Sequence, residues 1–128
     1  CAAVKFGING SSKRSGAKFL YVLQGELNGH DAEILKKTGK KAFMVVQAAY
    51  NSELTDKADV VLPAAIWSER CGTLTNTEGR VQMANQAVAP LGDAKADWEI
   101  LAMLAGKLGK NLGTSFNDVS KRAAKLLK

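Results

Sequence analysis

The sequence predicts an open α/β fold in which parallel strands alternate with helices. Three short apolar runs, over residues 19–23, 42–47 and 60–62, have the length of strands and lack the polar alternation of a half-exposed strand. Strands of this kind belong to a sheet covered on both faces, which is usually a parallel one. The gaps of about 18 and 12 residues between the runs suit helical crossovers. The resulting order β-α-β-α-β is the core of a doubly wound fold.

Both crossovers contain helix signals. The segment Asp31–Lys37 can form a helix that turns Ile34 and Leu35 inward and ends at Gly39. A second, short helix can start at Asn51 or Ser52, because both residue types are favourable N-caps, and continue to about residue 58.

After the third strand the pattern changes to an extended arm. Segments 72–76 and 80–84 are predicted to be strands or extended arms, separated by a tight turn in which Gly79 can adopt a positive φ. Ion pairs are expected across this turn among four charged residues, Glu69, Arg70, Glu78 and Arg80.

Two helices are predicted near the end of the sequence. The first covers about residues 95–108 and ends at Gly109, and the second begins with the capping pair Ser115 and Asp118. The apolar stripe expected on the first helix consists of Trp98, Leu101, Ala102, Ala105 and Leu108. The apolar face expected on the second consists of Val119, Ala123, Leu126 and Leu127. Trp67 and Trp98 are expected to be core anchors.

Length and composition indicate one globular domain. The chain has 128 residues, of which 46% are hydrophobic and 23% are charged. Its formal net charge of +6 is uneven, because residues 1–18 carry +4, residues 19–106 carry −3 and residues 107–128 carry +5. We therefore expect a basic N-terminal segment, residues 1–18, followed by a domain over residues 19–128. Since the positive excess lies at the two ends rather than on a folded face with aromatic residues, no nucleic-acid partner is expected.

Cysteine content and hydropathy bear on the cellular setting. Cys1 and Cys71 are too few for a disulfide framework or a metal cluster, which favours reduced thiols in the cytoplasm. The longest uncharged apolar run, residues 42–49, is far shorter than the ~20 residues of a membrane-spanning helix, so membrane insertion is not expected. No leader with a basic and then an apolar region opens the sequence, and secretion is not expected. Because the chain opens on Cys1 instead of Met, we expect it to be a piece of a longer polypeptide.

The most promising place for a ligand is the carboxyl edge of the predicted sheet. In open α/β sheets ligands bind beyond the carboxyl ends of the strands, which nominates residues 24–28, 47–52 and 63–67. The spacing of a dinucleotide-binding or phosphate-binding glycine loop is absent. Gly25 and Gly29 can either approach a ligand closely or merely shape turns. The lone His30 is expected to be a solvated loop residue, and no serine or cysteine has an obvious base.

Two motifs resemble a known family. The segment K-A-D-V-V-L-P-A-A at residues 57–65 and the segment T-N-T-E-G-R-V-Q at residues 75–82 are similar to the molybdopterin oxidoreductase superfamily. That group includes formate dehydrogenases, nitrate reductases and the large iron–sulfur subunit of respiratory complex I. The resemblance covers about residues 19–110 and implies a Rossmann-like open, mainly parallel sheet with flanking helices and an extended arm after the third strand.

The resemblance also implies a set of cofactor-binding residues. In the molybdenum and tungsten enzymes this subdomain holds one guanine arm of a bis-molybdopterin guanine dinucleotide. Carried over here, Gly25 and Glu26 would lie near the phosphates and ribose, and Gln47, Asn51 and Ser52 near the guanine. The enzymes typically have Asp directly after the Gln of the second strand, whereas this sequence has Ala48 there, which cannot accept a hydrogen bond. No residues that would ligate a metal or an iron–sulfur cluster are recognised, and no catalytic residue is expected.

Three functions follow from these observations. The first is a structural domain of the large iron–sulfur subunit of an NADH–quinone oxidoreductase-like complex, which Ala48 favours, with no cofactor in this segment and iron–sulfur clusters elsewhere in the subunit. The alternative is a guanine-arm-binding subdomain of an active formate dehydrogenase-type enzyme. The third is a freestanding nucleotide-binding or interaction module. The first two imply the rest of the subunit and other subunits as partners, and a cytoplasmic or matrix-side location peripheral to a membrane complex.

Overall fold

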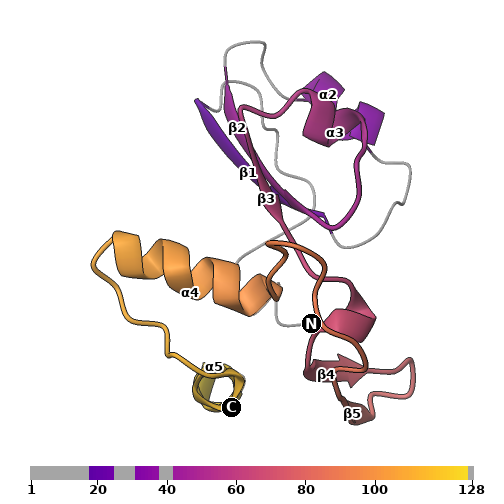
Figure 1. The fold of residues 1–128 in the computed structure, drawn as a ribbon, viewed down its shortest axis with the longest axis vertical. Helices are drawn as coiled ribbons and strands as arrows, with labels where there is room; N and C mark the ends of the chain where they lie inside the picture. Colours follow the sequence, from indigo (N-terminus) through magenta and orange to yellow (C-terminus); the bar gives the residue numbers. More distant parts are fainter. Residues whose placement is uncertain (1–17, 25–30, 38–41, 127–128) are drawn as a thin grey trace.

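The computed structural model confirms the open α/β fold (Figure 1). It describes residues 18–24, 31–37 and 42–126. The main sheet consists of β1 (Phe19–Leu23), β2 (Phe43–Ala48) and β3 (Val60–Pro63), in the order β1-β2-β3. Both pairings are parallel, with Leu23 opposite Gln47 and Gln47 opposite Leu62. The carboxyl ends of the three strands therefore meet at one edge of the sheet.

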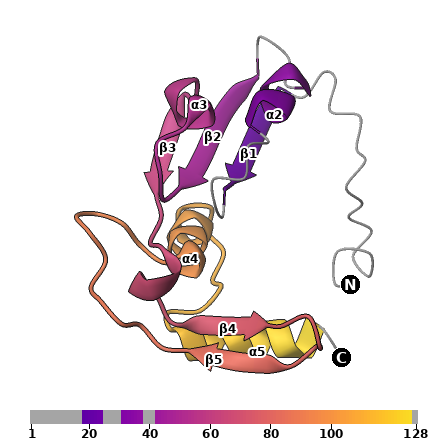
Figure 2. The ribbon, with the colours of Figure 1, turned by 90° about the vertical axis from the view of Figure 1, so that its right-hand side faces the viewer.

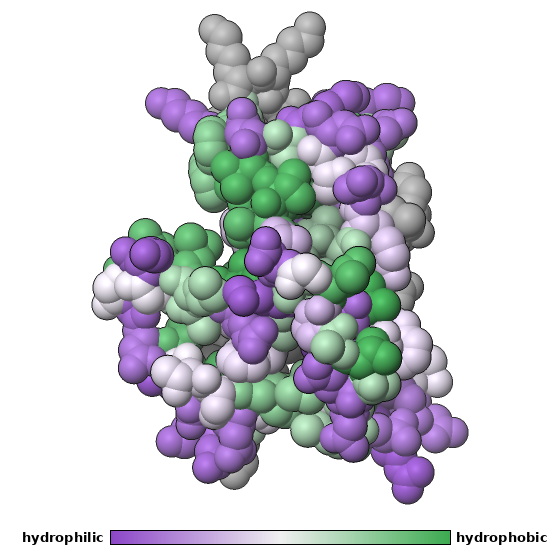
Figure 3. Space-filling view, in the orientation of Figure 1, coloured by the Kyte–Doolittle hydropathy of each residue, from purple (hydrophilic) through white to green (hydrophobic). Residues whose placement is uncertain are grey.

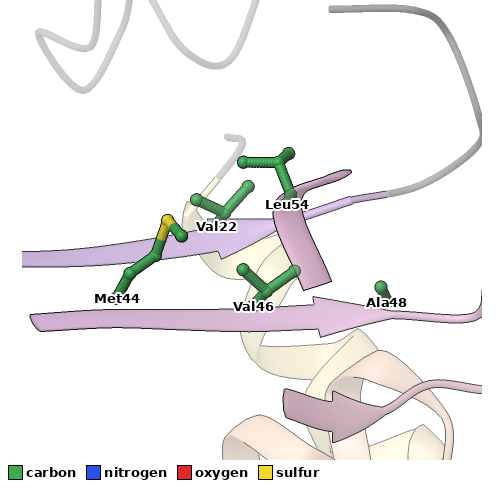
Figure 4. Packing of buried hydrophobic residues seen from close by; sticks show 5 residues of the cluster. All are labelled: Val22, Met44, Val46, Ala48 and Leu54. Atoms are coloured by element: carbon green, nitrogen blue, oxygen red, sulfur yellow. The ribbon is translucent and has the colours of Figure 1, made fainter. Parts of the chain in front are cut away.

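One face of the sheet is covered by α2 (Asp31–Lys37) and α3 (Glu53–Asp56). Figure 4 shows the side chains that form the core under these helices, Val22, Met44, Val46, Ala48 and Leu54. Ile34 and Leu35 of α2 pack against this cluster, as predicted. The predicted cap of the second helix is also confirmed, since the Leu54 amide donates to Ser52 Oγ at 3.2 Å. Gly39, the predicted end of the first helix, lies outside the described residues.

The opposite face is covered only in part by described residues. The strand register places Phe19, Tyr21, Phe43, Val45 and Gln47 on this face, and α4 (Asp97–Lys107) lies against its carboxyl end (Figures 1 and 2). Val45 and Gln47 are buried there, whereas Phe19 and Phe43 are 59% and 48% exposed. The rings of the two phenylalanines stack on each other at 6.1 Å. The expectation of a sheet covered on both faces is thus met at one end only.

The arm after β3 is an antiparallel hairpin that lies apart from the main sheet (Figure 2). A short 3-10 helix, η1 (Trp67–Glu69), leads into β4 (Gly72–Thr75) and β5 (Val81–Ala84). Gly79 in the turn has a φ of +81°, as the turn prediction requires. The helix α5 (Phe116–Leu126) runs beside the hairpin, and the rings of Phe116 and Trp98 lie 6.5 Å apart.

Two expectations about the arm are wrong. Arg70 forms its ion pair with Asp97 rather than across the turn, and Glu69 accepts a hydrogen bond from the Ile66 amide at 3.1 Å. Trp67 is 68% exposed and does not anchor the core. Arg70 pairs with Asp97 because the chain folds back after the hairpin and brings the start of α4 beside the beginning of the arm.

The apolar stripe predicted on α4 is confirmed in part, since Trp98, Ala102 and Ala105 are half-buried. Ile100 is the buried residue of this helix at 8% exposure, whereas Leu101 and Leu108 are 37% and 71% exposed. Apolar residues occur on nearly every side of α4, so their periodicity alone cannot identify the buried side. The predicted end is confirmed, because Gly109 follows the helix with a φ of +70°.

Candidate functional site

A first polar cluster lies where β1 and β2 end. The Gln24 amide donates to the carbonyl of Gln47 at 2.9 Å, which extends the β1–β2 pairing by one residue. The Gln24 side chain then bridges two helix starts. Its Nε2 donates to Asp31 Oδ1 at 3.1 Å, and its Oε1 accepts from Ser52 Oγ at 3.3 Å. Gln24 therefore ties the start of α2 to the cap of α3.

A second polar cluster lies beneath the sheet and is centred on Gln47, whose side chain is fully buried. Tyr21 OH donates to Gln47 Oε1 at 2.5 Å, and Gln47 Nε2 donates to Asp97 Oδ1 at 2.7 Å. The other oxygen of Asp97 pairs with the guanidinium of Arg70. We call Tyr21, Gln47, Asp97 and Arg70 the Gln47 network. It connects β1 and β2 to the start of α4 and to the beginning of the arm.

The electrostatics of this network favour a positioning role. Burial raises the pKa of Tyr21, so its phenol keeps the proton that it donates to Gln47. The side chains of Arg70 and Asp97 are 33% and 24% exposed, and water screens a pair of this kind. The ion pair therefore contributes little stability by itself and mainly fixes where α4 begins relative to the arm.

The predicted site residues do not converge on a common space. Gly25 and Glu26 lie outside the described residues. Gln47 points to the sheet face opposite the α2–α3 core, Ser52 caps α3, and Asn51 is exposed in the loop between β2 and α3. The structure brings Ser52 to Gln24, but it joins neither of them to the side chain of Gln47.

Sequence reasoning missed three members of the Gln47 network. Tyr21, Arg70 and Asp97 lie 26, 23 and 50 positions from Gln47 in the sequence, and no local motif links them. Alternation along the first strand could have placed Tyr21 on the same face as Gln47, once the parallel register was known. Gln24, in contrast, lies within the nominated loop after the first strand.

Two of the three residues predicted to lie near a guanine, Gln47 and Ser52, are bonded within the chain. Both ends of the Gln47 amide are bonded within the chain, and the hydroxyl of Ser52 is bonded to Gln24 and the α3 cap. Ala48 is 6% exposed and packs in the core with Leu54, so this position faces the interior. Of the predicted residues that the structure describes, Asn51 alone is exposed.

The described part of the chain offers neither a metal cluster nor a membrane span. There, no group of three or more His, Cys, Asp or Glu side chains is arranged to hold a metal ion. Cys71 is a half-buried free thiol. None of the helices in residues 18–24, 31–37 and 42–126 is long and apolar enough to cross a bilayer.

Comparison with known proteins identifies a family. Residues 4–107 match the family described as molybdopterin oxidoreductase. The alpha subunit of the F420-dependent formate dehydrogenase of Methanocaldococcus jannaschii is 47% identical over 106 residues, which are 80% of this chain and 16% of that protein. The G subunit of the NADH-quinone oxidoreductase of Rickettsia typhi is 38% identical over 120 residues, which are 93% of this chain and 17% of that protein. The chain thus spans about one sixth of the length of these relatives.

Proposed function

The chain belongs to the molybdopterin oxidoreductase family, and on this premise we propose that it is a structural domain of the large iron–sulfur subunit of an NADH–quinone oxidoreductase-like complex. The domain covers residues 19–128 and follows the basic N-terminal segment, residues 1–18. Electrons pass through iron–sulfur clusters elsewhere in the subunit, and this segment holds no cofactor. Its partners are the rest of its own subunit and other subunits of the complex, on the cytoplasmic or matrix side and peripheral to a membrane complex.

The internal bonding of both ends of the Gln47 amide is the observation that carries this proposal. A guanine presents several donors and acceptors, and each one left unpaired on burial costs about 1–3 kcal/mol. The side chain best placed by sequence to meet them is fully buried, with both ends of its amide bonded to Tyr21 and Asp97. Hydrogen bonds of this kind favour a role of Gln47 in holding the domain together over a role in binding a nucleotide.

The alternative is that the domain binds the guanine arm of a bis-molybdopterin guanine dinucleotide in a formate dehydrogenase-type enzyme. The 47% identity to the Methanocaldococcus protein favours it, as does the exposure of Tyr50 and Asn51 beyond β2. Gly25 and Glu26 would then hold the phosphates and ribose, and Gln47 would have to exchange its internal partners for the base.

Metal and pterin analysis of the native subunit distinguishes the two functions. The intact mass, iron, molybdenum, tungsten and pterin content should be measured on one purified sample. We expect a polypeptide far longer than 128 residues that contains iron and neither pterin nor molybdenum or tungsten. A long polypeptide with pterin dinucleotide and either metal would refute the structural role and support the alternative. A native chain of 128 residues would refute both and leave the freestanding module.

A matched pair of variants sharpens the test. Asn51→Ala in the full-length subunit removes the exposed amide beyond β2, and Asn85→Ala removes an exposed amide beyond the hairpin. If the domain has only a structural role, both variants should transfer electrons at the wild-type rate. Loss of pterin or of activity in Asn51→Ala alone would show that the residue contacts a cofactor.

A further inference from the structure

The helix α4 has apolar side chains on more sides than the other described residues cover. Ile100 packs inward at 8% exposure, yet Met103 and Leu104 are 58% and 40% exposed. A helix that is apolar nearly all round is normally surrounded by protein. We therefore expect another protein segment to pack on the exposed side of α4.

A groove of about 320 Å³ lies between this side of α4 and the edge strand β3. Leu62 and Pro63 line it from the strand, and Ile100, Met103 and Leu104 line it from the helix. The helical residues, together with Lys107, are spaced i, i+3, i+4 and i+7 and so form one stripe along α4. We call this feature the α4 groove.

The apolar surface continues from the groove onto the open face of the sheet. Val60 is 38% exposed and lies on the same face of β3 as Leu62, and beyond it are the exposed rings of Phe43 and Phe19. Figure 3 shows hydrophobic surface over the strands and over α4 in one view. A surface of this kind marks an interface in a folded protein.

The groove is unsuited to a small polar ligand. Sites for small molecules combine apolar walls with a few polar groups that point inward and orient the ligand. The charged residues at this groove, Asp93, Lys95 and Lys107, are all exposed. In the described part of the chain neither lysine forms an ion pair. Two lysines and one aspartate leave a charge of +1 at the rim, which an acidic neighbour would complement.

We propose that the α4 groove is the docking site for an amphipathic helix from another part of the same subunit. Its apolar face would pack on Met103 and Leu104, and acidic residues beside that face would pair with Lys95 and Lys107. A helix suits the site because helices cover both faces of a doubly wound sheet. The occupant has a source, since the chain spans only 16–17% of the length of its relatives. The inference rests on the part of the proposed function that places this chain in a longer subunit.

Site-directed photocrosslinking in the full-length subunit tests the proposal. A photoreactive amino acid replaces Met103 in one sample and Leu104 in a second, so that failure of one variant to fold still leaves a readout. The control position is Lys110, which is exposed beyond the end of α4 and does not line the groove. After irradiation, peptide mapping by mass spectrometry identifies the linked segment.

We expect Met103 and Leu104 to link to one and the same segment of the same polypeptide, outside residues 1–128, with acidic residues beside an apolar helical stripe. The control position Lys110 should not link to this segment, because it lies outside the α4 groove. Links to residues 1–17, to a second copy or to another subunit would overturn the proposal. The absence of any link from both Met103 and Leu104 would overturn it as well. Because iron and pterin are measured separately, a subunit can fail this test and still have the proposed structural function.

Discussion

At the residue scale, Gln47 shows how one buried polar side chain can hold several elements of a domain together. Its amide is the meeting point of β1, β2 and α4, and both of its ends are bonded at 2.5–2.7 Å. An apolar residue of the same size would pack equally well but would leave a phenol donor and a carboxylate acceptor without their partner. The cost of such a change is set mainly by the groups left behind, not by the bonds removed.

Gln47→Leu should therefore lower the free energy of unfolding by about 1–3 kcal/mol. Urea denaturation of the 128-residue chain, followed by far-UV circular dichroism, measures this change. Gln82→Leu is the matched control, because Gln82 is exposed on β5, and its stability should stay within about 0.5 kcal/mol of wild type. Equal effects of the two substitutions would show that the amide of Gln47 is not needed.

Sequence can predict residues whose partners are local, and not those whose partners are distant. Ser52 is recognisable as an N-cap because its acceptor role is fulfilled two residues away at Leu54. The Arg70–Asp97 pair is not recognisable, because the two residues are 27 positions apart and the whole hairpin lies between them. For the candidate site, the role of the loops at the sheet edge stays a prediction, and the commitment of Gln47 to internal bonds could be seen only in the tertiary structure.

At the scale of elements, the start of α5 is fixed by a cap that involves two side chains. The Asp118 amide donates to Ser115 Oγ at 3.2 Å, and Ser115 Oγ donates to Asp118 Oδ2 at 2.8 Å. The preceding Gly113 has a φ of +113°, and a Cβ at this position would approach the Asp118 Cβ to 2.7 Å. Glycine is therefore required by both conformation and space, and the capping pair predicted from sequence is confirmed.

This cap should make α5 sensitive to acid. The Ser115 hydroxyl and the Thr114 amide donate to the Asp118 carboxylate and hold its pKa below its ordinary value. A carboxyl whose pKa is lowered by folding stabilises the folded state above its unfolded pKa, and this contribution disappears as the pH falls through the lowered pKa. In the 128-residue chain, the carbon-13 resonance of the Asp118 carboxyl should titrate below the ordinary range, and the amides at the start of α5 should lose protection over the same interval.

Ser115→Ala supplies the test of this cause. Removal of the hydroxyl should return the pKa of Asp118 toward its ordinary value and fray the first turn of α5. Ser120→Ala, which changes a serine within α5 that is not bonded to Asp118, should leave that titration unchanged. An unchanged titration in Ser115→Ala would mean that another group depresses the pKa.

The other elements can be predicted to different extents, for identifiable reasons. The hairpin follows from its turn residues, and the three strands follow from their uninterrupted apolar runs. The buried side of α4 does not follow from sequence, because Trp98, Ile100, Leu101 and Met103 place apolar groups around most of the helix. The packing of α4 against the sheet determines which of these residues is buried. The others stay exposed and can contact a neighbouring part of the protein.

At the scale of the whole molecule, exposed apolar surface should make the isolated 128-residue chain associate with itself. Phe19, Phe43 and Met103 are each about half exposed, and no described element covers them. Sedimentation velocity should show a mass that increases with concentration. Phe43→Lys combined with Met103→Lys should raise the dissociation constant roughly tenfold or more, because each change places a charge in an apolar contact.

The control for this prediction is a substitution with the same chemistry elsewhere. Leu91 is 84% exposed and does not line the α4 groove, so Leu91→Lys should leave association within about twofold of wild type. A monomer at every concentration, or an equal effect of Leu91→Lys, would contradict the assignment of the association surface.

The Gln47 network also has a consequence for the order of events during synthesis. The three strands of the main sheet are complete at Pro63, but the amide of Gln47 lacks a permanent acceptor until Asp97 has been made and α4 has turned back beneath the sheet. In a ribosome-bound chain that ends before Asp97, the side-chain amide of Gln47 therefore lacks its carboxylate acceptor. Contacts between residues far apart in the sequence also form slowly. We expect the sheet to become resistant to protease on the ribosome only after α4 has emerged from the exit tunnel.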